Sequence, residues 1–570
     1  QGEVEEQLAA IWAELLHLDR VGRHDNFFEL GGHSLLAVSL IERMRREGVH
    51  ADVRTLFGAP TVAELAASAQ SSDTAIVVPP NRIPADAEAI TPDMLTLVDL
   101  DQDAIDRIVA TVDGGAANVQ DIYPLAPLQE GILFHHRVEQ VGDPYLLPQL
   151  LGFASHERLQ RFVAALQHVI DRHDILRTGI AWQGLAQPVQ VVRRQVAFPL
   201  SLVELDPQDG DIAEQLQARH DPRHVRLDVS QAPLLRGYAA QDSRNERWVL
   251  CLLTHHLISD HTTVELLVEE ALAIEDGRLH ELAAPAPFRN FVAQARLGVS
   301  QQEHEHFFRA LLGDIDEPTA PFGLLDVQGD GAHVQEASEE LPAALSTALR
   351  QHARRLGVSA ASLMHLAWAL VLARTTGRQD VVFGTVLFGR MQGGEQADRV
   401  LGLFINTLPV RLRVGRQPLA EALKQVHQLL AQLLRHEHAP LALTQRCSAV
   451  PAQTPLFTSL LNYRYSVHGS AAAQAAQAVQ GIEDLGGHER TNYPVTLSVD
   501  DLGEGFRITA LVSQPIQPQR VCQFMHSALQ GLLRVLEQQS AQPLQALNVL
   551  PISEQQQLLA WGANAREYPS

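Results

Sequence analysis

The stretch RWVLCLLTHHLISDHTTVELL, residues 247–267, says more about the fold of this chain than any other segment. Its first half is apolar and β-prone, which predicts a buried strand that ends in His255 and His256. Asp260 stands where the following amphipathic segment begins, which predicts a helix there. Polar groups at the end of a strand in an α/β fold commonly face a cleft, so we expect a reactive site at this junction.

The histidine pair allows more than one interpretation. A histidine titrates near working pH, so His256 can remove a proton from an incoming nucleophile or hold that nucleophile in place. A structural alternative is that both rings bond to the backbone. Three histidines and Asp260 cluster here, but adjacent strand side chains point to opposite faces, which disfavours joint metal ligation by His255 and His256. We favour acid–base chemistry and expect no metal.

Composition narrows the function class. The chain has 570 residues, too many for one core at about 150 residues per domain, and its 46% hydrophobic and 19% charged content is globular. A formal charge of −23 disfavours nucleic acid as a partner. The three cysteines are isolated, without disulfide or zinc spacing, and no apolar run approaches the roughly 18 residues of a membrane span. We expect a cytoplasmic protein without membrane contact.

The first seventy residues predict a small helical bundle. Apolar residues recur at helical spacing over residues 4–15, and Thr61 and Glu64 have capping-box spacing just after a proline. Ser34 follows a Gly-Gly-His turn and precedes an amphipathic helix, a position in which serine often serves only as the helix cap. Residues 68–92 are rich in Ser, Ala and Pro, which predicts a linker.

Beyond the linker, helical and strand-like segments alternate. Helical patterns such as residues 157–174 and 344–377 flank apolar strand-like runs such as residues 380–388 and 505–515. We expect a large α/β unit of two lobes that meet near residue 285.

Two motifs resemble those of nonribosomal peptide synthetases. FFELGGHSLLAVSLI, residues 27–41, resembles the carrier-domain signature, whose serine receives 4′-phosphopantetheine. HHLISDH, residues 255–261, resembles the His-His-x-x-x-Asp-Gly motif of condensation domains, relatives of chloramphenicol acetyltransferase, although His261 replaces the usual Gly. Further resemblances, in chain order, are DIYPLAPLQEGILFHH (121–136), RHDILRT (172–178), DVVFGTVLFGR (380–390), GLFINTLPVR (402–411) and ERTNYPVTLSV (489–499).

The resemblance implies a multidomain architecture: a small four-helix-bundle carrier domain followed by a two-lobed α/β condensation domain resembling chloramphenicol acetyltransferase. The predicted bounds are 1–72 for the carrier, 73–117 for the linker, 118–285 and 286–555 for the N- and C-lobes, and 556–570 for the start of a connector to an adenylation domain. Ser34 becomes the attachment point of the phosphopantetheine arm. The positive end of a helix dipole suits its phosphodiester.

A second signature concerns epimerisation. HHRVEQVGDPYLL, residues 135–147, contains His135, His136, five residues, then Gly142 and Asp143. It resembles the extended motif of dual epimerisation/condensation domains, which invert the Cα of a carrier-bound L-residue before joining it to the next amino acid. Arg137 stands where that motif usually has Ile or Leu, and the alternative is that both histidines line a loop.

The resemblance also assigns roles to single residues. His256 handles the proton of the acceptor amine in condensation, and Asp260 pairs with Arg390 to stabilise the site. Epimerisation needs a second proton-transfer group besides His256, which the sequence leaves open between Glu489, His135 and His136. Two further residues either line the cleft or satisfy turns: Asn406 and Tyr493.

The implied partners are a phosphopantetheinyl transferase, upstream and downstream adenylation domains, a downstream acceptor carrier, and aminoacyl or peptidyl thioesters. Alternative functions are a condensation domain that accepts a D-residue without epimerising, a stand-alone epimerisation domain, and a catalytically silent platform that recruits tailoring enzymes. Silent platforms tend to lack the active histidine, whereas His256 is present.

Overall fold

The N-terminal bundle packs around aromatic side chains. The computed structural model describes residues 2–16, 18–32, 36–37, 40–41, 43–44, 47–49, 51, 53–69, 77–138, 141–325, 327, 334–389, 400–465, 481–487, 491–538 and 542–562. The bundle contains α1 (Glu3–Leu15), α3 (Val53–Gly58) and α4 (Val62–Ala69), with further helical residues between positions 36 and 44. Trp12 is fully buried and meets Phe27 edge-on, with ring centroids 5.1 Å apart. The predicted capping box is present, because Glu64 N–H donates to Thr61 Oγ1 and Thr61 N–H to the Glu64 carboxylate.

The segment predicted as the linker 73–117 is folded from residue 77 on. It contains η1 (Pro92–Met94), α5 (Gln102–Ala110) and η2 (Gly115–Asn118). Ile83 and Ile105 are buried in one apolar cluster with Ile122 of the next strand, so this segment packs on the N-lobe. The Ser/Ala/Pro composition predicted no structure here because the apolar partners of these residues lie in strands further along the chain.

The N-lobe is built on a five-stranded sheet of order β12-β2-β7-β6-β5. Its strands are β2 (Leu146–Phe153), β5 (Leu200–Leu202), β6 (Leu235–Asp242), β7 (Arg247–His255) and β12 (Ile482–Gly487). A second sheet of order β1-β4-β3 comprises β1 (Val119–Pro124), β3 (Thr178–Ala181) and β4 (Val189–Arg193). The helices of this lobe are α6 (Pro127–Val138), α7 (His156–Arg172), α8 (Ile212–Arg219), α9 (His261–Glu275) and α10 (Phe288–Leu297).

The C-lobe is built on a six-stranded sheet of order β10-β9-β11-β13-β14-β8. Its strands are β8 (Val334–Glu340), β9 (Asp380–Leu387), β10 (Asn406–Arg413), β11 (Ser459–Tyr465), β13 (Val495–Asp501) and β14 (Phe506–Ser513). The helices are α11 (Gln301–Leu312), α12 (Ala343–Arg355), α13 (Ala360–Thr376), α14 (Leu419–Arg435), α15 (Leu441–Arg446) and α17 (Pro518–Gln538). Buried residues cover every face of α13, as expected of a helix enclosed between a sheet and other helices.

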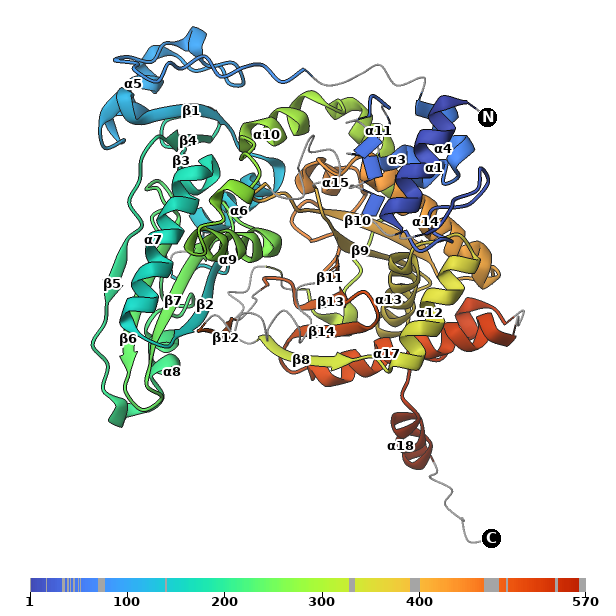
Figure 1. Cartoon of the computed structure of the whole chain (residues 1–570). Helices are drawn as coiled ribbons and strands as arrows, with labels where there is room; N and C mark the ends of the chain where they lie inside the picture. Colours follow the sequence, from blue (N-terminus) through green and yellow to red (C-terminus); the bar gives the residue numbers. More distant parts are fainter. Residues whose placement is uncertain are drawn as a thin grey trace, which may run out of the picture.

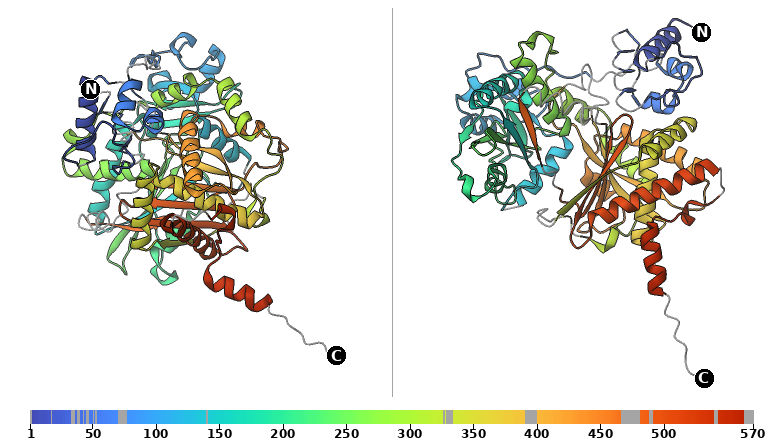
Figure 2. Two further views of the ribbon diagram at one scale, coloured as in Figure 1. Left: turned by 90° about the vertical axis from the view of Figure 1, so that its right-hand side faces the viewer. Right: turned by 60° about the horizontal axis from the view of Figure 1, so that its bottom comes forward.

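The two lobes exchange segments. The predicted boundary at 285 places β12 in the C-lobe, yet β12 pairs antiparallel with β2 and closes the edge of the N-lobe sheet. Leu401 and Phe404 also pack in the N-lobe core. The lobes lie side by side, and the bundle lies on the C-lobe, close to α14 (Figure 1 and Figure 2). Crossing strands of this kind are long-range pairings, which local sequence patterns do not report.

The chain leaves the C-lobe through α18 (Ile552–Gly562), which projects away from both lobes in Figure 1. Leu559 and Trp561 on this helix are exposed. Among the described residues, no single helix has the length and apolar content of a membrane span; α12 and α13, bent by 110°, meet that test only as a pair and only by length and composition.

Candidate active site

A cavity of about 1990 Å³ lies between the lobes and is lined by several of the predicted site residues. The N-lobe contributes His135, Tyr145 and His256 to its wall, and the C-lobe contributes Asn406 and Tyr493. Five side chains from sequence-distant elements therefore share one space.

His256 faces this cavity from the end of β7. Its Nδ1–H donates to the carbonyl of Ser259 at 2.9 Å, so the neutral ring carries its lone pair on Nε2. Its backbone N–H donates to the carbonyl of Tyr145 at 2.8 Å, which fixes the main chain beside the cavity. A lone pair on Nε2 is what a proton acceptor needs, and the proton-transfer role of His256 stays a prediction.

His255 points the other way, as the alternation of strand side chains requires. It is fully buried, and its Nδ1 accepts the backbone N–H of Leu257 at 3.0 Å. The proton therefore sits on Nε2, which donates to Asp143 Oδ2 at 3.0 Å. His255 is a positioning residue rather than a wall of the cavity.

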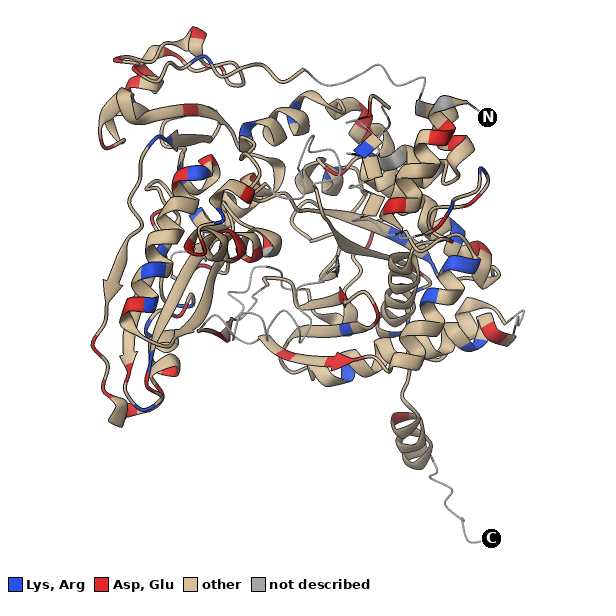
Figure 3. Cartoon of the chain, viewed as in Figure 1, with Lys and Arg blue, Asp and Glu red and all other residues tan. Residues whose placement is uncertain are grey.

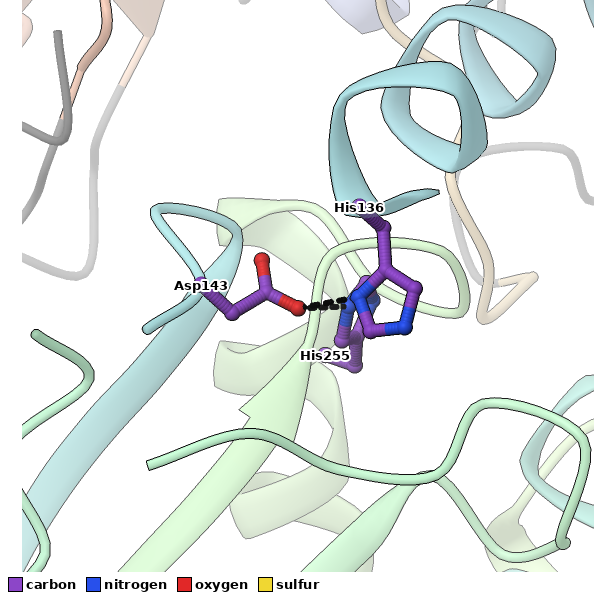
Figure 4. A group of neighbouring side chains, drawn as sticks. All are labelled: His136, Asp143 and His255. Atoms are coloured by element: carbon purple, nitrogen blue, oxygen red, sulfur yellow. Dashed lines mark hydrogen bonds and ion pairs between the residues drawn. The ribbon is translucent and has the colours of Figure 1, made fainter. Parts of the chain in front are cut away.

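Asp143 joins the two histidine motifs (Figure 4). It is buried, and its Oδ2 accepts Nδ1–H of His136 at 2.6 Å as well as the bond from His255. Burial by itself would raise the pKa of Asp143, but the two histidine hydrogen bonds hold that pKa well below its ordinary value. The carboxylate therefore stays ionised and locks both rings.

The same three residues have the spacing of a metal site. Ligand atoms of His136, Asp143 and His255 lie within 4.8 Å of one another. However, the bond from Leu257 N–H places the proton of His255 on Nε2, the atom that would face the ion. The tautomer thus favours a hydrogen-bonded positioning network over metal ligation.

The glycine of the extended motif is required by its backbone. Gly142 has φ 72°, and a Cβ at this position would lie 2.4 Å from the carbonyl oxygen of Arg223. Arg226 Nη1 donates to the Gly142 carbonyl at 3.0 Å, and Arg226 Nη2 donates to the carbonyl of His136. Arg226 therefore ties the end of α6 to the loop that carries Asp143, a role that no sequence motif indicated.

His135 and His136 are separated by the helix geometry. His136 is buried against Asp143, whereas His135 lines the cavity. The rings of His135 and Tyr145 lie 6.0 Å apart, and those of Tyr145 and His256 lie 6.4 Å apart. Tyr145, which the sequence motifs did not single out although it follows Asp143 by two residues, is therefore a neighbour of both cavity histidines.

Asp260 is the N-cap of α9. Its Oδ1 accepts the N–H and the hydroxyl of Thr263, each at 2.8 Å, and its Oδ2 accepts the N–H of Phe404 at 3.3 Å. The oxygen of that hydroxyl accepts the backbone N–H of Gly402 at 3.0 Å. Asp260 thus holds the segment that crosses back from the C-lobe. Arg390, its predicted ion-pair partner, lies outside the described residues.

Of the remaining predicted residues, the structure describes Asn406 and Tyr493. Asn406 donates both amide hydrogens, to the carbonyls of Glu437 and Ala439, so it fixes a turn while it lines the cavity. The Tyr493 ring stacks on Phe457 with centroids 5.9 Å apart. Ser34 and Glu489 lie outside the described residues, and their roles stay predictions.

The bundle meets the C-lobe at His427 of α14. The rings of Phe28 and Phe57 lie 5.1 and 5.5 Å from the His427 ring. Gly31 and Gly32, which belong to the Gly-Gly-His-Ser turn, line the inter-lobe cavity. The bundle therefore contacts α14 and contributes to the wall of the cavity.

Charge is distributed unevenly around the cavity. Acidic residues follow one another along α9, as the red ribbon in Figure 3 shows, and Glu265 and Glu269 of this helix line the cavity. On the C-lobe side, Arg350 and Arg354 of α12 line it. The α9 side therefore favours a cationic group, such as a protonated amine, over an anionic one.

Two family models match the chain. Residues 119–559 match the condensation domain. The chain belongs to the condensation-domain family. Residues 6–68 match the phosphopantetheine attachment site, so the condensation domain is preceded by a carrier domain on which 4′-phosphopantetheine is covalently attached. The predicted family and architecture are thereby confirmed.

Curated relatives of this condensation-domain chain are peptide synthetases. Malpinin synthetase from Mortierella alpina is 52% identical over all of this chain, and malpibaldin synthetase from the same organism is 49% identical. One of the proteins that make up the linear gramicidin synthase of Brevibacillus parabrevis is 30% identical over 85% of the chain. The chain spans only 7%, 10% and 6% of the lengths of these three proteins, respectively.

Solved structures share the fold. The condensation domain of the monacolin K polyketide synthase aligns along its whole length with 75% of this chain, at TM-score 0.59 and 19% identity. The first condensation domain of the calcium-dependent antibiotic synthetase covers 76% of the chain at TM-score 0.57 and 18% identity. At these identities the likeness concerns the two-lobed fold alone.

Proposed function

We propose that this chain epimerises a carrier-bound donor at Cα and then condenses it with the next amino acid on a nonribosomal peptide assembly line. The carrier and condensation domains support peptide-bond formation as the activity class. The donor is an L-aminoacyl or peptidyl thioester on the phosphopantetheine of Ser34. The acceptor is an aminoacyl group on a downstream carrier, supplied by adenylation domains.

Condensation requires alignment and one proton acceptor. The phosphopantetheine arm supplies a reactive thioester, whose conversion to an amide is downhill. His256, with its lone pair on Nε2, receives the proton of the attacking amine. His255 and Asp143 hold the strand end behind it, and Asp260 holds the neighbouring helix.

Epimerisation requires a base and an acid on opposite faces of Cα. The observation that supports this activity is that His135 and His256 line one cavity, and that the ring of Tyr145 lies 6.0 Å from the first and 6.4 Å from the second. We assign the second proton-transfer role to His135 and a positioning role to His136, which is bound to Asp143. Glu489 is the alternative partner of His256.

The test is hydrogen exchange at Cα. The chain is converted to its holo form by a phosphopantetheinyl transferase, loaded at Ser34 with L-alanyl, L-leucyl or L-phenylalanyl thioester, and incubated in deuterated buffer without acceptor. We expect deuterated D-amino acid on release, lost in His135→Ala. His135→Ala should still condense a D-aminoacyl donor, whereas His256→Ala should lose about 10²–10⁴-fold in condensation rate.

Other outcomes correspond to the alternative functions. Undeuterated L-product from every donor, with D-donors condensed normally, would identify a domain that accepts D-residues without epimerising. Full condensation by His256→Ala would exclude the proposed catalytic site. Neither exchange nor condensation with any donor would favour a recruitment platform.

A further inference from the structure

We propose that Tyr145 is a further catalytic residue, whose phenol donates a hydrogen bond to the thioester carbonyl oxygen as negative charge develops there. This inference rests on the condensing part of the proposed function and does not require epimerisation. The sequence motifs end at Asp143, so they assign nothing to Tyr145.

The position of Tyr145 is fixed from two sides. Its backbone N–H donates to Asp143 Oδ1 at 3.0 Å, and its carbonyl accepts the backbone N–H of His256 at 2.8 Å. Its ring lies 6.4 Å from the ring of His256, in an edge-on arrangement. The phenol is therefore held in register with the proton acceptor by the same carboxylate that locks both histidine motifs.

The Tyr145 hydroxyl is available to a substrate. Tyr145 lines the cavity, and within the part of the chain that the structure describes its hydroxyl makes no hydrogen bond. A phenol that is largely removed from water usually has a partner, so a substrate carbonyl would supply the missing acceptor. Burial raises the pKa of Tyr145 far above its ordinary value, and Tyr493 and Asp143 raise it further, so the hydroxyl keeps the proton that it donates.

Several neighbouring donors are already committed. The Asn406 amide donates to two carbonyls, and the relevant ring nitrogens of His136 and His255 donate to Asp143. The oxygen that becomes negative needs a hydrogen bond from a donor that is not committed in this way. Among the cavity side chains next to His256, Tyr145 has such a donor.

Condensation proceeds through addition to the thioester and loss of the thiol. The acceptor amine attacks the thioester carbon, the C=O π pair moves to oxygen, and Tyr145 O–H bonds to that oxygen without giving up its proton. His256 Nε2 takes one proton from the attacking nitrogen. The C=O bond then re-forms, the C–S bond breaks with its electrons on sulfur, and His256 returns the proton to give a free thiol and the amide.

The first test is single-turnover condensation. The holo chain is loaded with the thioester that wild type condenses fastest, and an aminoacyl-pantetheine serves as acceptor. Tyr145→Phe should lower the maximal rate constant by about 10²–10³-fold with an unchanged acceptor KM, because one oxyanion donor is removed and the ring shape is kept. Tyr238→Phe is the matched control, since Tyr238 stacks on His220 outside the cavity and should retain the wild-type rate.

The second test is independent of turnover. A ¹³C=O thioester is loaded on the holo chain without acceptor, and its carbonyl stretch is recorded. We expect a lower frequency in wild type than in Tyr145→Phe. A wild-type rate constant in Tyr145→Phe, equal carbonyl frequencies, or a rate loss confined to Tyr493→Phe would each overturn the proposal. If Tyr145→Phe shows the expected rate loss and frequency shift but wild type exchanges no deuterium at Cα, only the epimerisation part of the proposed function is refuted.

Discussion

Among single residues, Asp143 connects the parts of the candidate active site through its hydrogen bonds. Its carboxylate accepts hydrogen bonds from His136, His255 and the N–H of Tyr145, while its exposure is 1%. It therefore connects the extended histidine motif, the second histidine pair and the cavity tyrosine. A buried carboxylate with three donors around it tolerates no substitution that removes an acceptor.

Asp143→Asn should lower the free energy of unfolding by about 3 kcal/mol, because the new NH₂ group faces a donor in either orientation. Urea denaturation followed by circular dichroism measures this loss. Asp276→Asn is the control, since Asp276 forms an exposed pair with Arg278 and should change stability by no more than about 0.5 kcal/mol. A loss below about 1 kcal/mol in Asp143→Asn would contradict the locking role.

Among the secondary-structure elements, β12 joins the lobes. It leaves the C-lobe and pairs with β2, and Ile482 at its start is 4% exposed in the N-lobe core. Arg247 Nη1 and Glu483 add an ion pair at 2.7 Å between β7 and β12. β2 begins just after the loop that carries Asp143. Because β12 pairs with β2, β12 helps to hold that loop in place.

Ile482→Ala should cost about 2–4 kcal/mol through lost burial and the cavity left behind. The loss should be local, so hydrogen exchange should speed up in β12 and along β2 while β14 keeps its protection. Leu202→Ala serves as control, because Leu202 is 60% exposed and its truncation should leave exchange unchanged. Equal acceleration in β14 would show global rather than local destabilisation.

In the molecule as a whole, buried histidines link stability to pH. Burial lowers the pKa values of His365, His427 and His438 to about 4, from 6.5 in an exposed ring. The unfolded chain therefore binds protons that the folded chain excludes between pH 6.5 and 4. The contribution of these histidines to the free energy of unfolding is therefore present above pH 6.5 and is lost as the pH drops through this window. His427 also contacts Phe28 and Phe57 of the N-terminal bundle.

The free energy of unfolding should fall by about 1.5 kcal/mol per such histidine between roughly pH 6.5 and 5. Urea titrations at several pH values give this slope. His427→Phe keeps an aromatic ring beside Phe28 and Phe57 and should reduce the slope by one proton. His280→Ala, at an exposed position, should leave it unchanged. An unchanged slope in His427→Phe would mean that His427 does not titrate on unfolding.

Local patterns in the sequence were sufficient to predict the family and the architecture. Strand and helix periodicity predicted the α/β unit, and ordered short motifs identified the carrier and condensation domains, because these signals depend on neighbouring residues. The same patterns separated His255 from His256, since strand side chains alternate between faces.

The set of groups that share the cavity, by contrast, followed only from tertiary packing. The folded chain places Tyr145 next to His256 and His135 in the same cavity, turns His136 to Asp143, packs residues 77–117 onto the N-lobe, and carries β12 across the predicted lobe boundary. All but the His136–Asp143 bond depend on contacts between residues far apart in the chain. Periodicity and spacing describe the direction of a side chain within its own element, but the elements that surround it are set by packing.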